Sequence, residues 1–309
     1  MSGRGHSGFG QGHASMSIEL HCHTVFSVDA RGTPEDLVDV AADRGVTTLS
    51  ITEHDHLGSC ERAQARAAER GIECLPGVEL GAPWHERELH LLAIGFDSGN
   101  EPMQRLVDDS FSKYERHFDL LEPHLCAMGG PWTKQQMAAG LARRYPTHPA
   151  PIVSQWFARD FLVEQGVFPD LASCKVAINQ VRQRIIDEHG PQVFESGVSA
   201  QRILDTVHGA GGVVLLAHVA HYHRGDQAQQ IRLIHDVLDA GLDGFELYHP
   251  LNIAEPHFDA LVSEANQLDC VISGGSDCHD ARTDGPNALD CLQVPEQTID
   301  RLKSALAST

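Results

Sequence analysis

Residues 16–45 read MSIELHCHTVFSVDARGTPEDLVDVAADRG and contain a strand pattern, a polar cluster and a helix start. The short apolar run before His21 is typical of a buried strand. Thr33 and Pro34 predict a helix start, because the threonine hydroxyl can cap free N–H groups and proline suits the first helical position. An apolar stripe follows, and Gly45 marks the helix end. The stretch therefore predicts one strand–loop–helix unit with histidines at the end of its strand.

The same unit recurs along the chain. Helical patterns separate most of six further strand-like runs, which are 46–52, 72–80, 88–96, 211–219, 242–250 and 270–280. Apolar strands that alternate with helices indicate a parallel sheet covered on both faces. We therefore expect an α/β fold in which seven strands form a barrel.

Residues 100–199 differ in sequence pattern from the rest of the chain, because helical patterns there are joined by proline-rich segments. We interpret them as a helical insertion subdomain that covers one end of the barrel. The barrel domain would then comprise 16–99 and 200–309. Residues 1–15 are rich in glycine and serine and have no periodicity, which predicts a disordered tail or a cloning remnant.

The composition limits the partners. Lys and Arg number 23 against 43 Asp and Glu, giving a formal net charge of −20. Such a surface should repel long duplex nucleic acid and anionic membranes, so any phosphate chemistry must supply its own local positive charge.

The cysteines and the hydropathy favour a cytoplasmic protein. Eight scattered cysteines without a CxxC pair disfavour a disulfide framework and a thiolate zinc site, which fits a reducing compartment. No apolar run approaches the length of a membrane span.

Ionisable residues follow the apolar part of most predicted strands, at the edge where parallel α/β barrels assemble their sites. His21 and His23 are two residues apart, so both can face one ion. Glu79 follows a Pro-Gly pair that we expect to end a strand, and its two oxygens can bridge two metals. Asp277 and His279 repeat the two-residue spacing. Each feature alone also has a structural explanation as a loop, core or capping residue, but their joint occurrence favours a metal site.

The motifs ELHCHT, SITEHDH, PGVEL, HLLAIGF, LLAHV and GGSDCH, in this order, resemble the polymerase and histidinol phosphatase (PHP) family of metal-dependent phosphoesterases. The likeness covers about 17–99 and 200–290. It is greatest to the stand-alone branch of small nucleotide phosphatases and enzymes that process 3′-phosphates or short RNA. The resemblance implies a distorted seven-stranded (β/α)7 barrel with a helical insertion.

The resemblance also implies a trinuclear site of three divalent ions. The implied ligands are His21, His23, Glu79 and Asp277 for the first metal; Glu79, His90 and His218 for the second; and Asp29, His54 and His279 for the third. All nine positions carry a competent nitrogen or oxygen ligand. Such a set suits Mn, Fe or Zn.

The positive charge of three divalent ions would exceed the negative charge of three carboxylates. The pocket would therefore be positively charged on an otherwise acidic protein. We expect hydrolysis of a small phosphate ester, such as a nucleoside phosphate, a 3′,5′-bisphosphate or a short oligonucleotide end. A hydroxide that bridges two metals would attack phosphorus in line.

The expected catalytic residues are Asp277, His221 and Arg31, and the expected substrate-binding residues are Arg31, His221, Arg224 and His249. His56, His221 and His249 are candidates for protonating the leaving oxygen. Two positions depart from the family pattern. Glu53 replaces the usual aspartate, and the arginine that the family commonly has after the fifth strand is missing, so His221 or Arg224 would substitute for it.

Two other functions compete with the phosphoesterase prediction. An amidohydrolase-like C–N hydrolase or deaminase also begins with HxH, but usually needs a metal-bridging lysine near the fourth strand, where this chain has His90. A non-catalytic metal-binding barrel module should have lost ligands, and none is lost. The exact substrate, the metal and the oligomeric state stay open.

Overall fold

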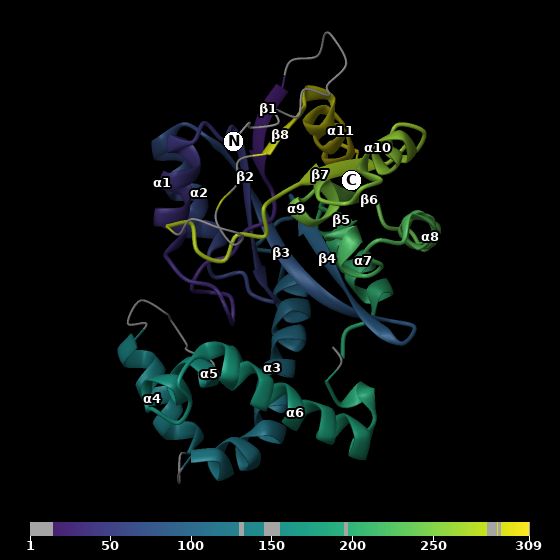
Figure 1. Ribbon diagram of the computed structural model, residues 1–309. Coiled ribbons are helices and arrows are strands. Elements are labelled where there is room, and N and C mark those ends of the chain that lie inside the picture. Colours follow the sequence, from purple (N-terminus) through teal and green to yellow (C-terminus); the bar gives the residue numbers. More distant parts are fainter. Residues whose placement is uncertain are drawn as a thin grey trace, which may run out of the picture.

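The computed structural model describes residues 15–129, 133–144, 155–194, 197–282, 289 and 292–308. The strands form one sheet in the order β7-β6-β5-β4-β3-β2-β1-β8 (Figure 1). They are β1 (Ser15–Glu19), β2 (Thr48–His54), β3 (Glu73–Trp84), β4 (Arg87–Ile94), β5 (Val213–Leu216), β6 (Gly244–Tyr248), β7 (Val271–Gly274) and β8 (Leu292–Pro295). The predicted α/β fold is confirmed, although β1 begins one residue inside the predicted tail and residues 1–14 lie outside the described ranges.

The prediction of a wholly parallel sheet is wrong at two strands. β4 runs antiparallel to both β3 and β5, and β8, which the sequence did not predict, runs antiparallel to β1. A tight turn joins β3 to β4, and His85 adopts a φ of 53° there. Because a hairpin needs no crossover helix, no helix lies between these two strands.

The Pro-Gly pair before Glu79 does not end a strand, contrary to expectation. Pro76 and Gly77 lie inside the twelve-residue strand β3, where Gly77 pairs with Thr52 on one side and Ile94 on the other. A Cβ at Gly77 would overlap the side chains of Ser50 and Thr52. The glycine is therefore needed for close packing within the sheet rather than for a turn.

The first and seventh strands meet beyond their ends. The backbone N–H of Leu20 donates to Gly274 O (3.0 Å), that of Asp277 to His21 O (2.8 Å) and that of His23 to Cys278 O (2.8 Å). These bonds join the two sides of the sheet at the edge that carries the predicted ligands.

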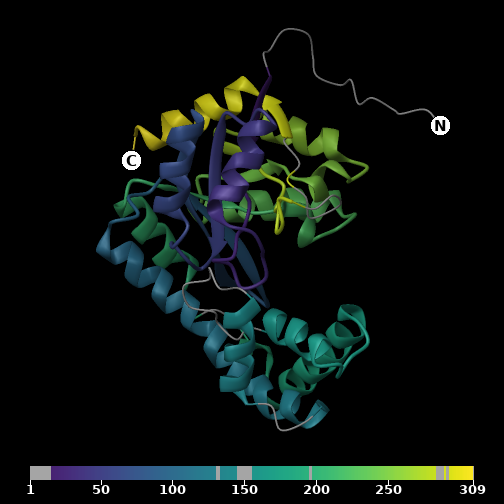
Figure 2. The ribbon, with the colours of Figure 1, turned by 90° about the vertical axis from the view of Figure 1, so that its left-hand side faces the viewer.

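Helices cover the outside of the sheet (Figures 1 and 2). They are α1 (Pro34–Asp43), α2 (Cys60–Arg70), α7 (Ala200–Gly209), α8 (Gln227–Asp239), α9 (Pro250–Ile253), α10 (Phe258–Ala265) and α11 (Glu296–Leu306), with the 3-10 turn η2 (Val219–His221). The predicted start of the first helix is confirmed: Thr33 Oγ1 accepts from Asp36 N (3.1 Å), and Asp36 accepts from Thr33 N in return. This capping box fixes where the chain leaves the site loop.

The described residues between 101 and 194 form helices that project beyond one end of the sheet (Figure 2). They are α3 (Glu101–Gly129), α4 (Lys134–Arg144), α5 (Gln155–Glu164), α6 (Leu171–His189) and the 3-10 turn η1 (Pro191–Phe194). Phe157, Phe161 and Ile178 belong to a second hydrophobic core here, separate from the barrel core. Helix α3 contributes to both, since Leu106 packs in the barrel core and Phe118 in the second.

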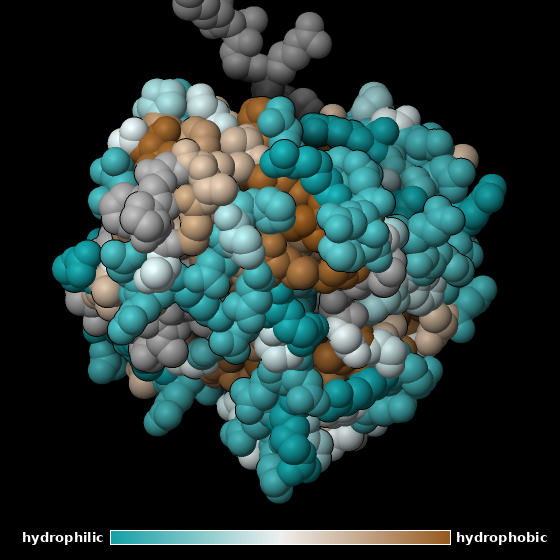
Figure 3. All heavy atoms as spheres, turned by 90° about the horizontal axis from the view of Figure 1, so that it is seen from below, coloured by the Kyte–Doolittle hydropathy of each residue, from teal (hydrophilic) through white to brown (hydrophobic). Residues whose placement is uncertain are grey.

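The surface seen from the insertion end is mostly hydrophilic (Figure 3), as a charge of −20 suggests. Among the helices that the structure describes, none is both long and apolar enough to cross a membrane.

Candidate metal centre

The segments that follow β1 and β7 meet Glu79 of β3, which brings four predicted ligands together. His21 Nε2 lies 3.3 Å from Glu79 Oε2 and 3.4 Å from Asp277 Oδ1. His23 Nε2 lies 3.4 Å and 3.1 Å from the same two atoms. The two histidines and Glu79 are almost fully buried, and Asp277 is partly exposed. One donor atom from each side chain lies within 4.8 Å of the others, which is a spacing that one ion can span.

Glu79 links this group to two others. Its Oε1 lies 2.8 Å from His90 Nδ1 and 3.3 Å from His218 Nε2, whereas its Oε2 lies 2.9 Å from His54 Nδ1. The antiparallel direction of β4 does not separate His90 from the cluster, because its partner across the ladder is Gly81, two residues after Glu79. Each carboxylate oxygen thus faces a different set of histidines, as a bridging ligand would.

Asp29 lies between the remaining two predicted ligands. Its carboxylate oxygens are 3.6 Å from His54 Nε2 and 3.5 Å from His279 Nε2. His23, His54 and His279 also form a compact group of possible ligands, although the sequence placed His23 in the first set alone. All nine predicted ligand residues therefore lie in one cluster.

The cluster has the chemistry of a cation site. Four buried atoms in it make no well-aligned hydrogen bond in the described part of the chain, although His54 Nδ1 lies close to the third of them: His21 Nε2, Asp29 Oδ1, Glu79 Oε2 and His218 Nδ1. Unsatisfied buried polar atoms are costly, and divalent ions would satisfy these lone pairs. The nitrogen and oxygen donors fit Mn, Fe or Zn.

Electrostatics within the cluster agree with this interpretation. Burial, together with the neighbouring His54 and His279, lowers the pKa of His23 to about 3, so its ring is neutral and has a free lone pair. Burial opposes charge on His54, but Glu79 and Asp29 outweigh it and raise the pKa of His54 to about 10. Because a cation would displace such a proton, metal binding here should weaken as the pH falls.

Backbone strain concentrates at the cluster. Four non-glycine residues in the described ranges have positive φ, and three of them are His218 (30°), Asp277 (55°) and Asp55 (52°), which lie in it or next to it. Each such conformation costs about 1–3 kcal/mol and persists where the surroundings enforce it, which is common at functional sites.

Two buried glutamates orient the ligands, a role that the sequence analysis did not assign. Glu246 lies 3.1 Å from His21 Nδ1 and accepts from His218 N (2.7 Å). Glu53 accepts from Ser27 Oγ (2.6 Å), and that hydroxyl lies 3.1 Å from His23 Nδ1. The glutamate that departs from the family pattern thus still supports a ligand. A carboxylate within an otherwise apolar strand was the available signal for Glu246.

We expect Glu246→Gln to lower Mn(II) affinity by about tenfold or more, because the amide supports the His21 ring less well than a carboxylate does. Calorimetric Mn(II) titration measures this. Glu264→Gln is the matched control, since Glu264 holds His235 at 2.7 Å on the surface. Equal affinity in the two variants would contradict the orienting role.

The family comparison agrees with this geometry. Residues 19–128 match the family described as the PHP domain. This part of the chain carries a PHP domain.

Similar proteins match most of the chain. A 5′-3′ exoribonuclease of Haemophilus influenzae is 27% identical over 270 residues, covering 86% of this chain and 90% of the relative. A 3′,5′-nucleoside bisphosphate phosphatase of Chromobacterium violaceum is 29% identical over 278 residues, covering 85% and 87%. A phosphoribosyl 1,2-cyclic phosphate 1,2-diphosphodiesterase of Eggerthella lenta is 26% identical over 277 residues, covering 85% and 94%.

Solved structures support the PHP fold. A structure described as a metal-dependent phosphoesterase from Bifidobacterium adolescentis matches with a TM-score of 0.73 and 24% identity, covering 95% of this chain and 98% of that one. A structure described as an amidohydrolase from Chromobacterium violaceum matches with a TM-score of 0.64 and 24% identity, covering 93% and 96%.

Of the predicted substrate-binding residues, His249 lies nearest the PHP ligand cluster. Its Nε2 is 4.0 Å from Asp277 Oδ2. Its Nδ1 accepts from Leu251 N (3.1 Å), so the neutral ring carries its proton on Nε2 and presents a donor to the cluster. Burial lowers the pKa of His249 to about 4, which keeps the ring neutral.

The other predicted substrate-binding and proton-donor residues lie outside the ligand cluster. His221 is exposed, with its ring 5.1 Å from that of His218, and Arg224 is exposed on the following loop. Arg31 is 43% exposed, and its guanidinium pairs with Asp160 of α5 at 2.8 Å. His56 instead packs between Phe26 and Phe111.

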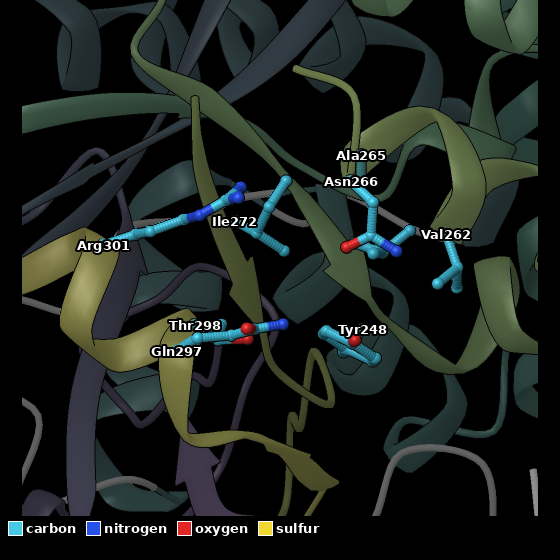
Figure 4. A pocket seen from close by; sticks show the side chains of 9 residues that line it. Tyr248, Val262, Ala265, Asn266, Ile272, Gln297, Thr298 and Arg301 are labelled. Carbon is cyan, nitrogen blue, oxygen red and sulfur yellow. The ribbon is translucent and has the colours of Figure 1, made fainter. Parts of the chain in front are cut away.

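A separate pocket lies between β6, β7, α10 and α11 (Figure 4). Its lining residues include Tyr248, Asn266, Gln297 and Arg301, and none of them is a histidine, a cysteine or a carboxylate. It therefore shares no residue with the ligand cluster.

Proposed function

We propose that this protein is a metal-dependent phosphoesterase that hydrolyses a small phosphate ester. The preferred substrates are nucleoside phosphates, 3′,5′-bisphosphates or short oligonucleotide ends. The observation that carries the proposal is the position of Glu79, whose two oxygens face separate histidine groups and so suit a multinuclear site.

We assign three divalent ions to the cluster, with Mn, Fe or Zn as candidates. The proposed ligand sets are His21, His23, Glu79 and Asp277; Glu79, His90 and His218; and Asp29, His54 and His279. When bound, such ions supply positive charge for the phosphate and lower the pKa of water.

The residues of the chain bind and orient the substrate. His249 directs its Nε2–H toward Asp277, from where it can donate to a phosphate oxygen. Arg31, His221 and Arg224 lie farther out and are proposed to contact the phosphate or the group beyond it. To contact the substrate, Arg31 must first break its ion pair with Asp160.

The relatives' names support this class of substrate. They include a nucleoside bisphosphate phosphatase, an exoribonuclease and a cyclic phosphate diesterase, which all act on phosphate esters of small nucleotides, sugars or RNA ends. The C–N hydrolase alternative has less support. Lys113, which lies beside β3 and β4, pairs with Asp55 at 2.8 Å and so is not disposed to bridge metals.

We expect the purified, Mn(II)-loaded protein to release phosphate or nucleotide from at least one of four substrates: a nucleoside monophosphate, a 3′,5′-bisphosphate, a 5′-phosphorylated trinucleotide or a ribose cyclic phosphate. Metal content is measured on the same sample. Ammonia release from nucleobases is measured in parallel to test the C–N hydrolase alternative. A protein that holds its metals yet hydrolyses none of the four esters would overturn the proposal.

A further inference from the structure

Three side chains of the insertion helix α3 converge on one buried residue of the barrel. Asp55 accepts from Ser110 Oγ (2.5 Å) and Tyr114 Oη (2.7 Å), and it pairs with Lys113 Nζ (2.8 Å). Residues 110, 113 and 114 lie on one face of the helix, because three or four positions make about one turn. Asp55 is 1% exposed and Lys113 is 4% exposed, so this contact is internal.

The barrel leaves space for the side chain of Lys113 beside a glycine. Lys113 Nζ lies 4.0 Å from Glu88 Oε1. A Cβ at Gly81 would lie only 2.7 Å from Nζ and equally close to the Glu88 carboxylate, so the two charged groups together fill the space beside this glycine. Gly81 is two residues beyond Glu79 and pairs with His90 in the sheet. The insertion helix thus reaches a strand that carries proposed metal ligands.

Asp55 is also tied directly to the ligand cluster. It follows His54, and its backbone N–H donates to Glu79 O at 2.9 Å. Its positive φ of 52° holds the chain in a strained turn at this point. A shift of Asp55 would therefore move His54, whose Nδ1 lies 2.9 Å from Glu79 Oε2.

We propose that Asp55 and Lys113 are a positioning pair, through which helix α3 of the insertion fixes His54 and so sets the affinity of the centre for divalent ions. The inference rests on the metal site of the proposed function, but not on its substrate. The insertion is then part of the metal centre's support. A buried ion pair suits this role, because removing one partner leaves an unpaired charge and so penalises alternative arrangements.

The test uses the double variant Asp55→Asn/Lys113→Met, which removes both charges together. Mn(II) binding to the full-length protein is followed by calorimetry, and circular dichroism checks the fold. We expect the dissociation constant for Mn(II) to rise by about tenfold or more. Turnover on any substrate found should recover at saturating Mn(II), because the proposed ligands are intact.

Arg202→Met is the matched control. Arg202 pairs with Asp109 at 2.6 Å, so it also joins α3 to a barrel helix, but this pair is exposed and remote from His54 in the sequence. A purely structural docking role predicts that both variants change thermal stability and that neither changes Mn(II) affinity. The positioning role predicts weaker Mn(II) binding in the double variant alone.

Gly81→Ala gives a second test that leaves both charges in place. The added methyl group would press on the Lys113 ammonium and on the neighbouring Glu88 carboxylate, and Mn(II) binding should again weaken. Glu88→Gln, which keeps Gly81 and Lys113, is the control for the contact with Glu88. Gly81→Ala decides the question if the double variant does not fold. Wild-type Mn(II) affinity in the folded variants would overturn the inference. Failure of the proposed function would look different, since wild-type protein would then bind Mn(II) but hydrolyse no ester.

Discussion

Glu79→Gln should reduce phosphate ester hydrolysis by about a thousandfold or more. Loss of bound metal removes positive charge that stabilises the transition state, which raises the activation free energy by several kcal/mol. The amide keeps the shape of the side chain but replaces one ligand oxygen with an NH2 group, which cannot bind a cation. Both oxygens of Glu79 lie within 3.5 Å of histidines on different sides. Bound metal per chain, measured by elemental analysis, should fall together with the turnover.

Glu73→Gln is the control for this experiment. Glu73 is the first residue of the same strand and pairs with Lys303 at 2.8 Å on the surface. Its replacement should leave metal content and turnover unchanged. If Glu79→Gln kept its metals and hydrolysed the substrate at the wild-type rate, the assignment of Glu79 as a bridging ligand would be wrong.

Removal of divalent ions by a chelator should abolish hydrolysis and lower the melting temperature, and Mn(II) should restore both. Asp29, Glu79 and Asp277 are three carboxylates held near one another around the buried histidines. An ion at a hundred times its dissociation constant contributes about 3 kcal/mol for each independent site. Thermal unfolding with and without Mn(II), alongside phosphate release, measures the effect.

The Glu79→Gln variant also serves as the control for the thermal experiment. Its melting temperature should respond to Mn(II) much less than that of the wild type, because its centre is incomplete. A wild-type melting temperature that is insensitive to both chelator and Mn(II) would show that divalent ions do not bind the folded protein.

The sequence predicted the features that depend on local spacing. The two-residue spacing of His21 and His23 placed both rings on one side. The nine proposed ligands come together from strand ends and, for Glu79 and His90, from within β3 and β4. The direction of β4 was not predictable in this way, because an apolar run looks the same whichever way the strand runs. Likewise, β8 depends on pairing with β1 across most of the chain.

Supporting contacts were the hardest to foresee. Glu246 and Glu53 act through hydrogen bonds to distant ligands, and the pairing of Asp55 with Lys113 requires an insertion helix to dock at a particular angle. None of these contacts has a periodic signature in the sequence. Only the three-dimensional arrangement distinguishes them from ordinary surface charges.

The junction between the first and seventh strands determines when the centre can form during synthesis. His23 and Asp277 are 254 positions apart, yet their side chains lie 3.1 Å from each other. A growing chain that has released only its amino-terminal half holds His21, His23 and Glu79 without Asp277. Complete metal loading must therefore follow translation of the last strands. His21 and His23 lack Asp277 until nearly the whole polypeptide has emerged.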